Sequence, residues 1–323
     1  MRINIPLTAV VTLCWLLTCQ ARAYDPLQPL LPAGSTHEVL LTDTKRDREI
    51  PLLVSVPQAS GQAPVILFSH GLGGSRRACR YLREQWTSRG YIAVFLQHPG
   101  SDESVWRSVP RQSRLAAMSE AASFKNGQAR IDDVGSVLDA LAAWQEEPGH
   151  LLEGRLDLEH IGMSGHSFGA RTTQAVSGQV GWAARNEPDH RIDAALILSP
   201  SAPRLRSAES LFGSVSIPWL LMTGTEDVAA IGSQTVASRL AVFPALPAGQ
   251  SYELVFDKGT HSAFTDGART PKDDRNPNHH PAIKAISTAF WDAFLCENPD
   301  AKAWLNGAGP RSVLEPADRW QTK

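Results

Sequence analysis

The stretch that decides the fold is Leu156-Asp-Leu-Glu-His-Ile-Gly-Met-Ser-Gly-His-Ser-Phe-Gly-Ala170. Its first half, residues 156–163, predicts a short buried strand, and residues 168–180 predict a helix. Between them, Gly165-His166-Ser167-Phe168-Gly169 fits G-x-S-x-G, the pattern of a nucleophile elbow. A serine at the tip of a sharp strand-to-helix turn needs an unfavourable backbone angle, and the two glycines let the flanking chain pass close by. The alternative is a Gly/Ser loop that matches the pattern by chance.

On both sides of this stretch, short apolar runs alternate with helical patterns. Repeated alternation of this kind predicts an α/β fold with a mostly parallel central sheet and helices on both faces. Near the N-terminus, residues 37–42 and 50–56 flank a charged turn, which predicts an antiparallel hairpin at the sheet edge. The other expected strands are 64–69, 91–97, 156–163, 194–198, 219–223 and 252–256, and the expected helices are 76–89, 129–144, 168–180, 232–242 and 283–295.

The chain has 323 residues, a formal net charge of −2 and 42% hydrophobic residues. This composition suits a globular protein with a sizeable core, and the near-neutral charge without basic runs argues against nucleic acid as a partner. We find no internal repeat and no linker after residue 24, so we expect a single domain over 24–323. Within it, residues 98–128 are loosely patterned and longer than an ordinary connection, and they can form a cap over a site.

The N-terminus has the features of a secretory signal peptide. Arg2 precedes an apolar run over 5–19, and Ala21-Arg22-Ala23 supplies a small-x-small cleavage site. The run is short for a membrane span. We therefore expect residues 1–23 to be removed, the protein to be exported (periplasmic or secreted), and no stable membrane span to remain. A lipoprotein cleaved before Cys19 is the alternative.

A serine hydroxyl becomes a good nucleophile only when an oriented base accepts its proton. In this kind of sheet the acid and then the histidine follow the serine in the chain. Asp227 comes just beyond the end of one expected strand, and His261 follows the next one. Loops at the carboxyl ends of parallel strands are where such folds place their sites. Glu226 and Asp257 are competing acids that fit the spacing less well.

Three other histidines are weaker candidates for the base. His166 is next to the nucleophile and cannot fold back to serve it. His279 and His280 follow a polar, proline-flanked loop and are expected to be solvated; a metal site built from them and nearby aspartates fits no recognised ligand spacing. We predict no metal and no cofactor.

The oxyanion formed on attack needs two N–H donors. The elbow supplies the amide of Phe168, and the Gly-rich loop 69–74, directly after the strand over 64–69, supplies a second donor, the amide of Leu72. A phosphate-binding loop is the alternative, but the loop lacks the lysine and the full dinucleotide pattern. In the cap segment, Trp106 and Met118 can line an acyl pocket or pack the segment internally.

These motifs resemble the α/β-hydrolase superfamily. Phe68-Ser-His-Gly-Leu-Gly-Gly-Ser75 and the elbow are similar to the oxyanion loop and elbow of platelet-activating-factor acetylhydrolases and bacterial dienelactone-hydrolase-like esterases. The resemblance in order and spacing runs from about Glu38 to Leu295. It implies the α/β-hydrolase fold and the oxyanion roles of Leu72 and Phe168.

Two features depart from those relatives. Ser167 stands where true dienelactone hydrolases have a cysteine, and no carboxylate stands at residues 199–201, where the acetylhydrolases carry their acid. In this fold the helices that carry Cys79 and end at Cys296 commonly cover the same sheet face, so the resemblance implies a disulfide between them; two separate buried thiols are the alternative.

The sequence therefore predicts an exported serine esterase that cleaves a small-molecule carboxylic ester through an acyl-enzyme. Ser167 attacks, His261 transfers the proton, and Asp227 supports the imidazolium. A serine peptidase or amidase on the same fold, and a non-catalytic binding protein on a hydrolase scaffold, are the alternatives.

Overall fold

The computed structural model describes residues 23–181, 187–203, 206–267 and 276–323. The predicted signal peptide lies almost wholly outside these residues. Nine strands form one sheet in the order β1-β2-β4-β3-β5-β6-β7-β8-β9. Their bounds are β1 Ser35–Asp43, β2 Arg48–Val56, β3 Ala63–Ser69, β4 Ile92–Leu96, β5 Leu156–His166, β6 Ala194–Leu198, β7 Trp219–Glu226, β8 Ser251–Thr260 and β9 Arg319–Thr322.

The predicted α/β class is confirmed. From β4 through β3, β5, β6 and β7 to β8, every neighbouring pair of strands is parallel. The N-terminal hairpin β1–β2 joins β4 in antiparallel orientation, as predicted. At the other edge, β9 pairs antiparallel with β8, and the sequence did not predict this strand.

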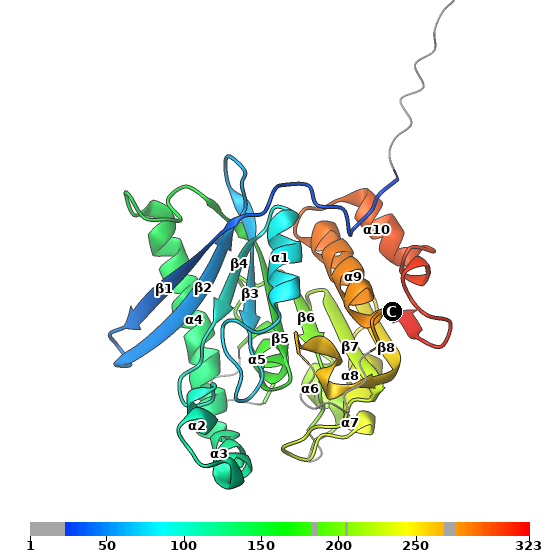
Figure 1. Ribbon diagram of the computed structural model, residues 1–323. Helices are drawn as coiled ribbons and strands as arrows, with labels where there is room; N and C mark the ends of the chain where they lie inside the picture. The colour runs from blue at the N-terminus through cyan, green and yellow to red at the C-terminus, as the bar shows by residue number, and fades with distance from the viewer. Residues whose placement is uncertain (1–22, 182–186, 204–205, 268–275) are drawn as a thin grey trace, which may run out of the picture.

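Helices cover both faces of the sheet (Figure 1). On one face lie α1, α9 and α10, and on the other α4, α5, α6 and α8. The helices are α1 Arg80–Ser88, α2 Ser104–Arg107, α3 Arg114–Ala121, α4 Phe124–Glu146, α5 Phe168–Ser177, α6 Ala208–Phe212, α7 Val236–Leu240, α8 Val242–Ala245, α9 His279–Phe294 and α10 Pro299–Asn306, with short 3-10 turns η1 Arg111–Ser113, η2 His261–Phe264 and η3 Pro310–Ser312.

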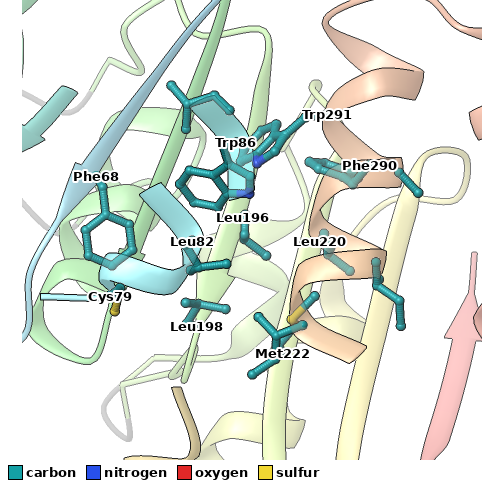
Figure 2. Packing of buried hydrophobic residues seen from close by; sticks show 14 of the residues in the cluster. Phe68, Cys79, Leu82, Trp86, Leu196, Leu198, Leu220, Met222, Phe290 and Trp291 are labelled. Atoms are coloured by element: carbon teal, nitrogen blue, oxygen red, sulfur yellow. The ribbon is translucent and has the colours of Figure 1, made fainter. Parts of the chain in front are cut away.

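Alternate residues of the central strands enter two different cores, because successive side chains in a strand point to opposite faces. In β3, Phe68 joins the core under α1 and α9, whereas Leu67 joins the core under α4. Figure 2 shows the first core, in which Trp86 of α1 and Trp291 of α9 meet above the strands. Their ring centres are 5.9 Å apart in an edge-to-face arrangement. Both faces are apolar, which explains why these strands read as continuous hydrophobic runs.

The predicted disulfide between Cys79 and Cys296 is not present. The helices do cover the same face, but α1 and α9 run parallel: Tyr81 stacks on His280 near the start of both helices, and Tyr91 contacts Cys296 beyond the end of both. Cys79 precedes α1 and Cys296 follows α9. The two cysteines therefore lie at opposite ends of a helix about 24 Å long, beyond the reach of a disulfide.

The segment predicted as a cap, residues 98–128, contains α2, η1, α3 and the first turn of α4. It lies at the same end of the sheet as α7 (Figure 1). This is the end where the parallel strands finish, since Trp106 of α2 contacts Gly73 just after β3 and Arg239 of α7 contacts Asp227 just after β7. Within the described residues, no helix is both long and apolar enough to cross a membrane.

Candidate active site

Ser167 stands at the junction of β5 and α5 with φ 59° and ψ −110°. This backbone conformation is unfavourable for a residue with a side chain and costs about 1–3 kcal/mol, so the surrounding structure has to hold it. The Ser167 amide donates to the carbonyl of Leu198 on β6, 3.0 Å away. The sharp turn places Ser167 beyond the end of the sheet, where it is partly exposed between the buried residues His166 and Phe168.

The two elbow glycines are required by close backbone contacts. A Cβ at Gly165 would lie 2.4 Å from the carbonyl oxygen of Gly169, and a Cβ at Gly169 would lie 1.8 Å from the carbonyl oxygen of Ser69. Both distances are far below van der Waals contact. These two backbone contacts explain why the elbow needs glycine at both positions.

The Gly-rich loop after β3 lies against the elbow. Ser69 pairs with Gly165 in the sheet, and a Cβ on Gly71 would be 3.4 Å from Cβ of Ser167. Leu72, the next residue, therefore starts beside the nucleophile. This proximity is what a second oxyanion donor requires, together with the amide of Phe168 at the start of α5.

His261 and Asp227 meet Ser167 in the order predicted. Nε2 of His261 lies 2.8 Å from Oγ of Ser167, and Nδ1 lies 2.7 Å from Oδ1 of Asp227. Because a carboxylate only accepts, Nδ1 carries the proton and Nε2 is left to accept from the serine. The arrangement can therefore deprotonate Ser167 and stabilise the imidazolium that forms.

A close approach of β7 and β8 brings the acid and the histidine together. A Cβ on Gly224 would lie 2.1 Å from the carbonyl oxygen of Gly259, so only glycine fits there. The pairing shifts register just beyond, where Glu226 faces Thr260. Glu226, the competing acid, is exposed in this pair, whereas the Asp227 side chain is fully buried.

The buried carboxylate of Asp227 has several partners. Thr223 donates to Oδ2 at 2.9 Å, and Nε of Arg239 lies 2.9 Å from Oδ1. Burial acts to raise the pKa of Asp227, but the hydrogen bond and charge of His261 and the charge of Arg239 lower it overall. The acid is therefore ionised at neutral pH.

The other candidate histidines do not contact Ser167 as a base would. His166 places Nε2 3.1 Å from the carbonyl oxygen of His261, next to the site. His279 and His280 are not solvated as predicted: α9 starts at His279, which packs against Phe256, and His280 stacks on Tyr81. The helix begins four residues earlier than the pattern indicated, and this draws both rings into contacts with their neighbours.

A second Ser–His–Asp set, which the sequence did not predict, lies behind the oxyanion loop. Nε2 of His98 is 2.9 Å from Oγ of Ser69, and Nδ1 is 2.9 Å from Oδ2 of Asp133. All three side chains are fully buried. Burial and the charge of Arg130 lower the pKa of His98 to about 4, so this imidazole is neutral.

Arg130 of α4 joins this buried network to both sides of the candidate oxyanion hole. Its Nη1 donates to the carbonyl of His70 at 2.6 Å, and its guanidinium lies over the ring of Phe168, 4.5 Å from the centroid.

The cap segment contacts the same loop from outside. Nε1 of Trp106 donates to the carbonyl of Gly73 at 2.7 Å. A side chain on Gly73 would collide with Met118. The cap segment thus packs directly on the loop that carries Leu72.

Within the described residues, no group of three or more His, Cys, Asp or Glu side chains is placed to hold a metal ion. No protein-family model matches the chain, and no curated protein of similar sequence was found.

Proposed function

We propose that this protein is a serine hydrolase of the α/β-hydrolase superfamily that cleaves carboxylic esters through an acyl-enzyme. The observation that carries the proposal is the continuous chain of contacts from Ser167 through His261 to Asp227, with distances of 2.8 and 2.7 Å. The strained, partly exposed position of Ser167 at the end of a parallel strand supports it, because a nucleophile has to reach its substrate.

In the proposed mechanism, His261 takes the proton of Ser167 as the oxygen attacks the ester carbonyl. The tetrahedral oxyanion accepts hydrogen bonds from the amides of Leu72 and Phe168, and the alcohol leaves with the proton returned by His261. Water then attacks the acyl-enzyme with His261 as the base, the ester bond to Ser167 breaks, and the carboxylic acid leaves as the proton returns to Ser167. Asp227 keeps the imidazole in the required tautomer and stabilises its charged form throughout.

We further propose export, with residues 1–23 removed as a signal peptide. Removal before Tyr24 is compatible with the docking of that residue, whose hydroxyl donates to Asp292 at 2.7 Å. The first residue of the processed chain would then be anchored on α9.

The test is turnover of p-nitrophenyl acetate and butyrate by the wild-type protein and by Ser167→Ala. We expect the variant to lose activity by roughly 10⁴-fold or more while its circular dichroism is unchanged. Ser69→Ala, the same deletion in the buried set, is the matched control and should lose about tenfold or less of its activity, since it removes contacts with His98 and Arg130 away from the reacting serine. Turnover retained by Ser167→Ala would overturn the proposal, and peptide amides assayed in parallel would reveal a peptidase.

A further inference from the structure

Arg239 of α7 lies beside the acid–base pair formed by Asp227 and His261. Its guanidinium is almost fully buried. Nε lies 2.9 Å from Oδ1 of Asp227, the same oxygen that accepts from His261, and Nη2 lies 3.3 Å from Nδ1 of His261. The cation therefore contacts both members of the pair.

The same guanidinium is fixed by backbone carbonyls. Nη1 donates to the carbonyls of Ser199 and Pro200 at 2.8 and 3.0 Å, and Nε also lies 2.7 Å from the carbonyl oxygen of Asp227. These carbonyls belong to the loops that follow β6 and β7. The charge is thus held at a defined place rather than on a freely moving side chain.

A fixed cation at this place acts against protonation of the histidine. A carboxylate alone favours the charged imidazolium, whereas a positive charge a few ångströms away disfavours it. The serine can be activated only while His261 is neutral, because Nε2 has to accept the proton. Arg239 places such a charge 3.3 Å from Nδ1 of His261.

The other groups that face the pair differ from Arg239 in being neutral, titratable or exposed. Thr223 and Ser167 are neutral hydroxyls in contact with Asp227 and His261, respectively. The ring of His166 lies 4.7 Å from the ring of His261. Glu226 and Lys258 are exposed near the ends of β7 and β8, where solvent screens them.

We propose that Arg239 is a positioning residue that holds Asp227 against His261 and keeps the base active at lower pH than an Asp–His pair alone would allow. This inference rests on the proposed hydrolase function. It goes beyond it by assigning the acid limit of the reaction to a residue outside the Ser–His–Asp set.

The test is kcat/KM for a p-nitrophenyl ester measured as a function of pH, since this profile reports the ionisations of the free enzyme. The wild-type protein is compared with Arg239→Lys and Arg239→Gln. We expect the acid limb to move to higher pH by about one unit in the Gln variant. The Lys variant should move less, because its charge remains but cannot reach all of the same atoms. Arg191→Gln, at a surface pair with Asp139 and Asp189, is the matched control and should keep the wild-type profile.

A merely structural role would lower the rate at every pH and leave the acid limb in place, and that result would overturn the inference. If Arg239→Gln does not fold, Arg239→Met, which also removes the charge and has a similar length, takes its place, and an unmoved acid limb in that variant contradicts the proposal. Labelling of Ser167 by a fluorophosphonate in the wild-type protein distinguishes failure of this inference from failure of the proposed hydrolase function. If wild-type protein is neither labelled nor active, the hydrolase proposal itself fails. If it is labelled but the pH profiles of wild type and Arg239→Gln have the same acid limb, only the role of Arg239 is disproved.

Discussion

The molecule contains two Ser–His–Asp sets with nearly the same internal geometry. In the outer set, Ser167–His261–Asp227, the two contacts are 2.8 and 2.7 Å. In the inner set, Ser69–His98–Asp133, both are 2.9 Å. In each, the carboxylate accepts from Nδ1, which leaves Nε2 to accept from the serine. Each acid is also paired with arginine: Arg239 outside, and Arg46 and Arg48 inside.

What separates the two sets is their access and backbone. Ser167 is partly exposed at a strained turn, beside amides that can receive an oxyanion. Ser69 is fully buried at the end of an extended strand, and Arg130 also approaches its hydroxyl at 3.4 Å. The pKa of His98 is lowered to about 4 by burial and by Arg130. Contact distances alone therefore do not identify a catalytic triad; a position from which the serine can reach a substrate is needed as well.

Substitution of the acid in each set, Asp227 or Asp133, should produce the largest difference between the two sets. Asp227→Asn should lower kcat by about 10⁴-fold, because an amide favours the wrong tautomer of His261. Asp133→Asn should instead lower the free energy of unfolding by about 3 kcal/mol, since it leaves the partly buried Arg46 and Arg48 without their buried carboxylate partner. Esterase kinetics and urea unfolding of both variants measure these effects. A 10⁴-fold loss of kcat in folded Asp133→Asn would mean that the inner set takes part in catalysis.

The glycine at the contact between the sets should be the most sensitive backbone position. Gly169→Ala places a Cβ where Ser69 has its carbonyl oxygen, so we expect a loss of about 4 kcal/mol or more in the free energy of unfolding. The matched control is Gly135→Ala in the interior of α4, where a Cβ meets no atom within 4 Å. That variant should gain about 0.5–1 kcal/mol from helix propensity. Equal stability of the two variants in urea would show that the tight contact is absent.

The inner set should make stability depend on pH in a defined window. The pKa of His98 is near 4 in the folded chain and about 6.5 in an unfolded one. The unfolded state therefore binds the proton first, so the contribution of His98 to stability is full above about pH 6.5, declines as the pH falls below that value, and is lost once the pH has fallen through the folded pKa near 4. The loss attributable to His98 is about 3 kcal/mol. Thermal unfolding from pH 7 to pH 4 should show it, and His98→Gln should flatten the curve; a variant as steep as wild type would contradict the assignment.

The cap segment should have the smallest effect. Trp106→Phe removes the hydrogen bond to the carbonyl of Gly73 but keeps an aromatic ring at the oxyanion loop. We expect kcat/KM to fall only severalfold, in line with about 1 kcal/mol for one hydrogen bond. Arg107→Gln, which alters an exposed ion pair with Glu103 on the same short helix, is the control and should stay near wild type. A loss of 10³-fold in the Phe variant would assign the cap a direct part in catalysis.

Much of the fold was predictable because the central strands are apolar on both faces. The hairpin at the N-terminal edge was predictable from its charged turn. The C-terminal part was not: α10 and β9 fall in a stretch with weak periodicity, and β9 has only four residues whose pairing with β8 depends on tertiary contact. The prediction of a disulfide between Cys79 and Cys296 was wrong because the resemblance indicates which helices share a face but not where each cysteine lies along that face.

In the candidate site, Ser167, Asp227 and His261 were predictable because each directly follows a recognisable strand. Arg239 was not, since nothing in its local sequence distinguishes it from other arginines on short helices. The inner set was also missed: Ser69, His98 and Asp133 come from three elements and form no motif, although each stands beside a segment already singled out. Only the pairing of β3 with β4 and the packing of α4 on that part of the sheet bring them together.

The most direct test of the central claim is to find which serine reacts. The protein is incubated with a fluorophosphonate, digested, and the modified peptide is identified by mass spectrometry. We expect one adduct per chain, on Ser167, formed at a rate that falls sharply in His261→Ala, and no adduct on Ser69. An adduct on another serine, or none in folded protein, would contradict this claim.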